Sequence, residues 1–206
     1  MSARDEPGIR ATLDAFIRNY QHRYPLLEDV YDPEWPSPCE IDLPYTRPGD
    51  APGIQRIRWA PLARDPESTA RDFEPLERAL QVTVHPDIKE YFGAYWSGGL
   101  EAEAPEGHVS LILLWNDRDR ERLIENLLGH AIAKQRARSG FSVFFACTEV
   151  DSELFLSIDN ETGVVLLEKP GHKPVRQVAD SLTDFIVQLV PAPPEVHPDR
   201  KMLVGR

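Results

Sequence analysis

The stretch from Phe141 to Leu167 reads FSVFFACTEVDSELFLSIDNETGVVLL. It contains three short apolar runs, which are rich in Val, Ile and Phe and are separated by polar residues: Phe141–Cys147, Leu154–Ile158 and Val164–Leu167. This pattern is typical of strands in an antiparallel meander. The second turn, Asp159–Gly163, ends in a glycine that can take the positive φ of a tight hairpin. We therefore predict an antiparallel sheet at the centre of the fold.

The rest of the chain predicts helices that pack on this sheet. Apolar residues recur at helical spacing from Gly8 to Tyr24, from Pro86 to Trp96, and in a helix capped by Asn116 or Asp117. Further predicted elements are a short helix over Pro75–Leu80, a hairpin of Leu100–Ala104 with His108–Leu114, an edge strand over Pro174–Val178, and a last helix capped by Ser181. The fold class is therefore predicted to be α+β, a single domain with a mostly antiparallel sheet packed by helices.

Chain length and proline content set the expected organisation. With 206 residues, the chain is long enough for one domain, which we expect to span residues 1–191. Residues 25–66 are rich in proline and lack a sustained period, so they predict an extended arm with little regular structure. Within this arm, Ile54–Trp59 is expected to regain a strand. Residues 192–206 are expected to form a flexible C-terminal tail.

The helix that starts after Trp115 leaves two points open. Gly129 costs about 1 kcal/mol relative to alanine, so the helix could end or kink there or continue through it. Residues 131–138 could continue the helix or form a strand. Lys134, Arg136 and Arg138 form the one basic cluster, which we interpret as a solvent-exposed end.

The net charge of −11 limits the classes of partner. Nucleic acid demands a basic surface, and an anionic lipid leaflet repels an acidic protein, so we expect neither nucleic-acid binding nor direct lipid binding. No apolar run approaches a membrane span or the core of a signal peptide, so we expect a cytoplasmic protein. Cys39 and Cys147 lie far apart without metal-type spacing and are expected to be free thiols.

The sequence contains no motif for catalysis or for cofactor binding. It lacks a phosphate-binding glycine loop, a nucleophile elbow, a zinc-protease motif and paired cysteines, and its histidines are scattered. We therefore expect no catalytic residues, no metal, no cofactor and no small-molecule substrate. An enzyme that uses carboxylate pairs, or His130 with Cys147, remains the least favoured alternative.

The most distinctive feature of the sequence is the distribution of its acidic residues along the chain. Three windows, Tyr24–Thr46, Glu90–Asp117 and Ser139–Glu168, contain many acidic residues but neither Lys nor Arg. Two of these windows include predicted hairpins, and in the first hairpin Glu101 and Glu103 have the two-residue spacing that places both on one solvent-facing side. A shared acidic face without local counterions would favour a basic partner.

Several segments in order resemble the Syd proteins. The segments that carry this resemblance are Trp35–Ile41 (WPSPCEI), Glu77–Leu80 with His85–Pro86, Trp115, Glu125–His130 (ENLLGH) and Val143–Ala146. The resemblance covers Ile9 to Pro191; residues 45–53 and the segment after Pro191 depart from the family pattern. Neither departure touches these segments.

The resemblance implies a cytoplasmic protein, held peripherally at the inner membrane, that binds cytoplasmic loops of the SecY translocation channel and monitors its assembly. It also implies a compact α/β fold of the broader Smi1/Knr4-like group with a concave acidic face. The acidic positions that we assign to partner binding are Glu101, Glu103, Asp117, Asp119, Glu149, Asp151 and Glu153. Because related folds also serve in immunity, the alternative function is an immunity-type module that binds and masks a toxin enzyme.

Overall fold

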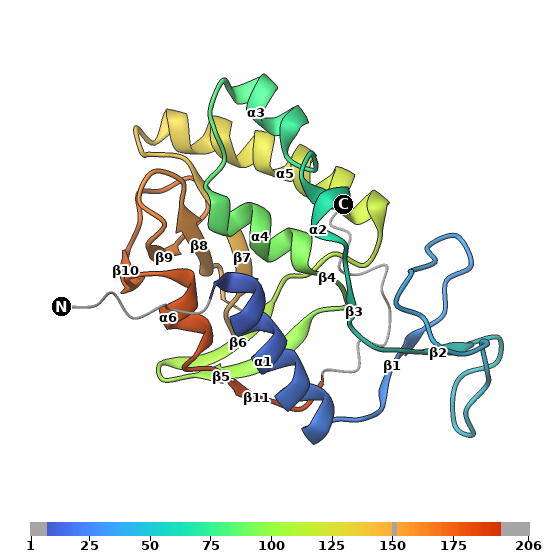
Figure 1. The fold of residues 1–206 in the computed structure, drawn as a ribbon. Coiled ribbons are helices and arrows are strands. Elements are labelled where there is room, and N and C mark those ends of the chain that lie inside the picture. The colour runs from blue at the N-terminus through green and yellow to red at the C-terminus, as the bar shows by residue number, and fades with distance from the viewer. Residues whose placement is uncertain (1–7, 150–151, 195–206) are drawn as a thin grey trace.

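Seven strands form one antiparallel sheet at the centre of the structure, a computed structural model that describes residues 8–149 and 152–194. The strand order is β10-β9-β8-β7-β6-β5-β11. The bounds are β5 (Leu100–Ala104), β6 (Gly107–Leu111), β7 (Ser142–Cys147), β8 (Phe155–Asp159), β9 (Val165–Glu168), β10 (Arg176–Ala179) and β11 (Val190–Pro191). Helices pack around this sheet (Figure 1), so the predicted α+β fold is confirmed.

A β-bulge in β7 keeps one face of the meander apolar. Phe144 is paired with Ser157 and Ala146 with Leu156, so Phe145 is the additional residue of the bulge. Phe145 and Ala146 are fully buried in the core, whereas Phe144 is only partly buried. We call the side of the sheet that faces the main core the inner face, and the side that bears Phe144 the outer face.

The hairpin between β8 and β9 has the predicted turn chemistry. Gly163 adopts φ 77°, and its amide donates to the carbonyl oxygen of Asp159 at 2.9 Å. The Asp159 carboxylate accepts from the amides of Glu161 and Thr162, so the donors within the turn are satisfied. A Cβ atom on Gly163 would lie 2.7 Å from Nε2 of His85, so glycine is required by space as well as by φ.

Three helices cover the inner face: α1 (Ile9–Arg23), α4 (Pro86–Ala94) and α6 (Leu182–Ile186) (Figure 1). The ring of Phe145 lies between Tyr91 of α4 and Phe185 of α6, at centroid distances of 5.6 and 5.7 Å. Burial of one such side chain contributes roughly 1.5–3 kcal/mol, so this aromatic row ties both helices to β7. The apolar stripe of α1 is buried as predicted, at Ile9, Leu13, Phe16, Ile17 and Tyr20.

Helix α5 (Asp117–Arg136) resolves both points that the sequence left open. Asn116 is the cap, since its Oδ1 accepts from the amide of Asp119 at 3.0 Å. The helix passes through Gly129 and continues to Arg136, so it does not end at Gly129, and residues 131–136 are helical. Gly129 is exposed, and its modest cost is outweighed by the buried apolar side of the helix.

The last turns of α5 are fixed to the outer face of the sheet. The interpretation of Lys134 as part of a solvent-exposed end was wrong, because its side chain is 2% exposed and donates to Oε2 of Glu168 at 2.6 Å. Ser157 donates to the other oxygen of Glu168 at 2.8 Å. One turn earlier, His130 Nε2 lies 3.1 Å from the hydroxyl of Ser142. These polar contacts explain why the C-terminal part of α5 lies on the meander.

The proline-rich arm has more regular structure than predicted. Strands β1 (Leu27–Val30) and β2 (Arg56–Trp59) pair antiparallel, and bridges at Glu40 and Tyr45 flank β2 on its other side. The expected strand within Ile54–Trp59 is confirmed. The sequence shows no sustained alternation of apolar and polar residues here, because these strands are short and are separated by a long loop.

The arm is attached to the start of α5 through Trp35 and Pro36. The indole Nε1 of Trp115 donates to the carbonyl of Trp35 at 3.0 Å, and the amide group of Asn116 donates to the carbonyl of Pro36 at 2.8 Å. The guanidinium of Arg122 lies over the Trp35 ring at 3.9 Å. The segment WPSPC therefore acts in the fold as the anchor of the arm.

The remaining elements are short. Helices α2 (Pro66–Thr69) and α3 (Glu74–Leu80) follow β3 (Leu62–Ala63), which pairs with β4 (Tyr95–Trp96). Helix α4 therefore ends at Ala94 and not at Trp96 as predicted, because the chain becomes extended at Tyr95. Strand β10 and the Ser181 cap of α6 confirm the predictions for that part of the chain.

After Pro191, the amide of Ala192 still donates to the carbonyl of Glu101 at 2.9 Å. The remainder of the expected tail, 195–206, lies outside the described residues. Among the helices of the described part of the chain, none has the length and apolarity of a bilayer-spanning segment. Cys39 and Cys147 are both free thiols, as predicted.

Candidate functional site

A polar row crosses the outer face of three neighbouring strands. In the register of the sheet, Glu101 of β5 is paired with Ser110 of β6, which is paired with Cys147 of β7. Paired residues of antiparallel strands point to the same side, so these three side chains share the outer face. Their neighbours along the strands, such as Leu100 and Leu111, are fully buried on the inner face.

His108 joins this row to a second carboxylate. Its Nε2 lies 2.8 Å from Oε2 of Glu101, and its Nδ1 lies 3.3 Å from Oε1 of Glu103. Ser110 donates to the other oxygen of Glu101 at 2.8 Å. Glu149, which follows β7, accepts from the backbone amide of His108 at 3.3 Å. We call Glu101, Glu103, Glu149 and His108 the His108 cluster.

The members of the His108 cluster differ in exposure. The side chain of Glu103 is 58% exposed, that of His108 is 20% exposed, and that of Glu101 is only 5% exposed. The prediction that Glu101 and Glu103 lie on one side of the hairpin is confirmed, but the prediction that both face solvent was wrong for Glu101. The buried carboxylate is tolerated because His108 and Ser110 satisfy both of its oxygens.

Charge controls protonation within this cluster. Partial burial of the ring opposes the imidazolium form, but hydrogen bonds to Glu101 and Glu103 outweigh it and raise the pKa of His108 above its ordinary value. Cys147 is an exposed residue, but partial desolvation of its thiol raises the pKa of that thiol, and the negative charge of Glu101 adds to the shift. The cluster is thus arranged to hold positive charge and to disfavour further negative charge.

Asp117 and Asp119 lie elsewhere, at the start of α5. The Asp117 carboxylate is 72% exposed on its side chain and pairs with Arg120 at 3.2 Å. Asp119 accepts from the backbone amide of Trp115 at 3.1 Å, so it contributes to the beginning of the helix. Figure 1 shows the β5–β6 turn at the lower left and the start of α5 at the right, so these two positions are not part of the His108 cluster.

The two remaining predicted positions belong to the segment between β7 and β8. Glu153 pairs with Lys169 at 2.5 Å, and the hydrogen bond from Lys169, together with its positive charge, lowers the pKa of Glu153. Asp151 lies outside the described residues. The structure therefore brings together three of the seven predicted positions, Glu101, Glu103 and Glu149.

The idea that the acidic windows lack counterions was wrong for several residues. Windows defined along the sequence omit basic residues that approach in space from other segments. The acidic residues paired in this way include Glu28 with Arg47 and Arg58, Asp42 with Arg58, Glu106 with Arg176, Glu153 with Lys169, and Glu168 with Lys134. In contrast, Glu101 and Glu103 both lie against a histidine, His108, and that residue was not included in the prediction.

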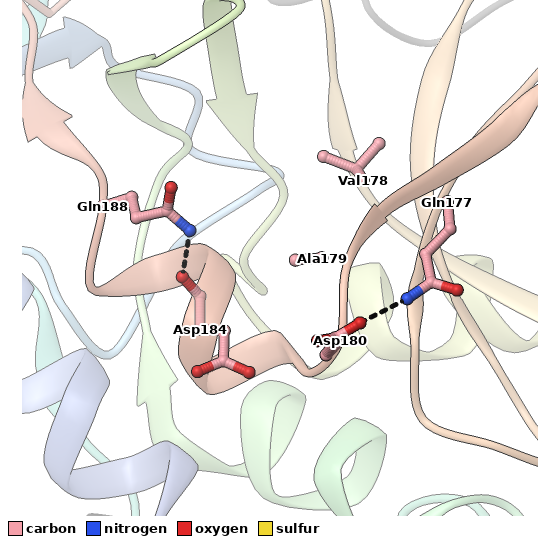
Figure 2. Close-up of a pocket in the computed structure, with 6 residues that line it drawn as sticks. All are labelled: Gln177, Val178, Ala179, Asp180, Asp184 and Gln188. Carbon is pink, nitrogen blue, oxygen red and sulfur yellow. Dashed lines mark hydrogen bonds between the residues drawn. The ribbon is translucent and has the colours of Figure 1, made fainter.

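Two hollows indent the surface of the described residues. Figure 2 shows the first, of about 420 Å³, between β10 and α6, where Gln177 donates to Asp180 and Gln188 donates to the backbone carbonyl of Asp184, each at 2.6 Å. The second lies at the start of α5 and is lined by Pro36, Ser37, Pro38, Asn116, Asp117 and Arg118. Within residues 8–149 and 152–194, no group of His, Cys, Asp and Glu side chains could hold a metal ion.

Comparison with known proteins identifies the family. The family described as Syd protein (SUKH-2) matches residues 9–191. The chain belongs to the Syd family. It is 37% identical over 185 residues to Protein Syd of Alteromonas mediterranea, a match that covers 89% of this chain and 96% of the relative. It is also 36% identical over 161 residues to Protein Syd of Pseudoalteromonas atlantica, covering 78% and 82% of the two chains.

A further Syd relative is more similar over a shorter region. Protein Syd of Hahella chejuensis is 44% identical over 119 residues, which cover 58% of this chain and 61% of the relative. The resemblance inferred from the sequence segments is therefore confirmed. The residues that match the family, 9–191, include both the arm and the His108 cluster.

Proposed function

We propose that this chain is a noncatalytic binding protein that docks through an acidic surface on basic cytoplasmic loops of the SecY protein-translocation channel. The observation that carries the proposal is the convergence of three carboxylates on His108 at the outer face of β5 and β6: Glu101 and Glu103 contact its imidazole, and Glu149 contacts its backbone amide. Membership of the Syd family supports SecY as the partner, in line with what the sequence resemblance implies.

Electrostatics favours this type of partner. Cytoplasmic loops of membrane-spanning proteins are enriched in Lys and Arg, and complementary charge increases both the rate and the specificity of docking. Anionic lipid headgroups repel a protein with a net charge of −11. Under this proposal the protein is cytoplasmic and is held at the inner membrane only through its partner, whose assembly it could monitor.

The other acidic positions contribute to different extents. Asp117 is well exposed, and its pair with Arg120 is a surface contact worth at most about 1 kcal/mol, so the carboxylate remains open to a partner. Asp119 positions the start of α5 and acts indirectly. Glu153 must exchange Lys169 for a partner cation. Asp151, in the same segment, is retained in the proposal as a contact.

The test is a charge reversal that spares the buried carboxylate. The double variant Glu103→Lys/Glu149→Lys should lose retention on inverted inner-membrane vesicles that contain overproduced SecY. At a separation of ~7 Å, one pair of charges in water interacts by roughly 0.6 kcal/mol, so two reversals should weaken retention by about tenfold or more at low salt. Raising the salt concentration should weaken retention of the unaltered protein as well.

The matched control is Glu161→Lys, which changes an exposed carboxylate in the turn between β8 and β9. It should be retained like the unaltered protein, and all variants should unfold at similar temperatures. Equal retention of the double variant and the control would refute the docking surface. Capture of a toxin domain in place of the channel from solubilised membranes would instead favour the immunity-type alternative.

A further inference from the structure

Both ring nitrogens of His108 face a carboxylate oxygen. Nε2 lies 2.8 Å from Glu101 and Nδ1 lies 3.3 Å from Glu103. A neutral imidazole carries only one N–H, and its other nitrogen is an acceptor that cannot bond to a carboxylate. Both contacts are favourable together only when the ring is the imidazolium ion. His108 therefore supplies the positive charge that holds the two carboxylates close together.

We infer that His108 is an internal counter-cation that takes the place of the partner's Lys or Arg, so that docking expels its proton and becomes tighter as the pH rises. This inference rests on the proposed function and specifies how the same surface is regulated. A cationic partner group can bind Glu103, Glu149 and the exposed edge of the cluster most strongly when the imidazole is neutral.

The side chains that contact His108 are carboxylates, and the turn before it also carries the ion pair of Glu106 with Arg176, whose charges offset each other. Strand β5 presents Glu101 and Glu103, the segment after β7 presents Glu149, and β7 presents the Cys147 thiol. Strand β6 contributes the hydroxyl of Ser110. On the other side of β5, the register places Val190 opposite Glu103, which adds no charge.

The direction of the pH dependence follows from this charge count. Three carboxylates and one imidazolium leave two negative charges in the cluster, and loss of the imidazolium proton leaves three. An approaching cation repels the imidazolium, so docking lowers the pKa of His108. By linkage, the affinity rises as the pH passes upward through the pKa of the free protein, by at most about tenfold per pH unit for a single group.

The first measurement needs no partner. Nitrogen NMR of the His108 ring in the full-length protein, from about pH 6 to about pH 8, reports whether both nitrogens carry protons. We expect the doubly protonated ring to persist above the ordinary pKa of histidine. A neutral ring with an ordinary or lowered pKa would overturn the inference, whatever the partner is.

The second measurement uses hexalysine as the probe, because its ammonium groups stay charged over this range. Calorimetric titration at low salt should show binding that tightens about threefold or more from about pH 6 to about pH 8, with release of a proton. His108→Gln keeps a polar side chain but cannot titrate, so it should bind with little pH dependence and without that proton release. His22→Gln, at an exposed histidine in the last turn of α1, should behave like the unaltered protein.

The outcomes separate the two proposals. Binding of hexalysine that is equally pH-dependent in the unaltered protein and in His108→Gln would overturn the role of His108 and leave the acidic docking surface intact. Binding that is independent of pH in both would do the same. Failure of hexalysine to bind at any pH, or binding that Glu103→Lys does not weaken, would overturn the acidic docking surface and this inference with it. Circular dichroism of each variant verifies that it is folded.

Discussion

The ammonium group of Lys134 on α5 lies 2.6 Å from Oε2 of Glu168 on β9, and the two side chains are 2% and 0% exposed. Removal of one partner leaves a buried charge without compensation, which typically costs about 3–5 kcal/mol. We therefore expect Lys134→Met and Glu168→Leu each to lower the free energy of unfolding by about that amount. Equilibrium unfolding in urea measures the change.

The double variant Lys134→Met/Glu168→Leu distinguishes a paired charge from simple loss of packing. It removes both charges at once, so we expect it to be far more stable than the sum of the single changes predicts. Ser157 loses its acceptor in this variant, which leaves a deficit of about 1 kcal/mol relative to the unaltered protein. Single variants that each cost under about 1 kcal/mol would contradict a tightly coupled buried pair.

Two glycines that the sequence singled out should respond in opposite directions to alanine. At Gly163, φ is 77° and a Cβ would lie 2.7 Å from His85, so Gly163→Ala should cost about 1–3 kcal/mol. At Gly129, inside α5, nothing lies within 4 Å of the added Cβ, so Gly129→Ala should stabilise by about 0.5–1 kcal/mol. For a chain of this size, 1 kcal/mol corresponds to about 2–4 °C in Tm.

Thermal unfolding of the two variants side by side is the measurement, and each variant serves as the control for the other. A raised Tm for Gly163→Ala would show that the turn does not depend on positive φ. A lowered Tm for Gly129→Ala would show that α5 is interrupted at this residue, as the sequence alone suggested.

The fold could be predicted well where local pattern and tertiary packing agree. The β7–β9 meander and the Gly163 turn follow from alternating apolar runs and a left-handed residue, both of which are local properties. The end of α5 could not be predicted, because the local cost of Gly129 is outweighed by contacts with distant strands. Lys134 gave no sequence signal of burial, since its partner Glu168 is far away along the chain.

Part of the His108 cluster could be predicted from the sequence. With Pro105 and Glu106 as a two-residue turn, the hairpin register places His108 opposite Glu103, although the predicted acidic face did not include this histidine. The contribution of Glu149 depends on the pairing of β6 with β7, which are separated by the whole of α5. Long-range pairing of this kind leaves no local signal.

The thiol of Cys147 provides a sensitive probe of the charge on Glu101. Because burial and Glu101 raise the pKa of the thiol, less thiolate is present at about pH 7.5 than in free cysteine, and only the thiolate reacts with alkylating reagents. We expect alkylation by iodoacetamide to be slower than that of free cysteine and to accelerate as the pH rises. Glu101→Gln removes the negative charge and should accelerate the reaction, by a fewfold at most because burial remains.

Glu103→Gln is the matched control, since Glu103 belongs to the same cluster but does not contribute to the shift at Cys147. Its alkylation rate should equal that of the unaltered protein. Cys39 is 1% exposed and should react only on unfolding, so Cys147→Ser should abolish labelling of the native protein. Equal rates for Glu101→Gln and Glu103→Gln would mean that Glu101 does not act on the thiol as a charge.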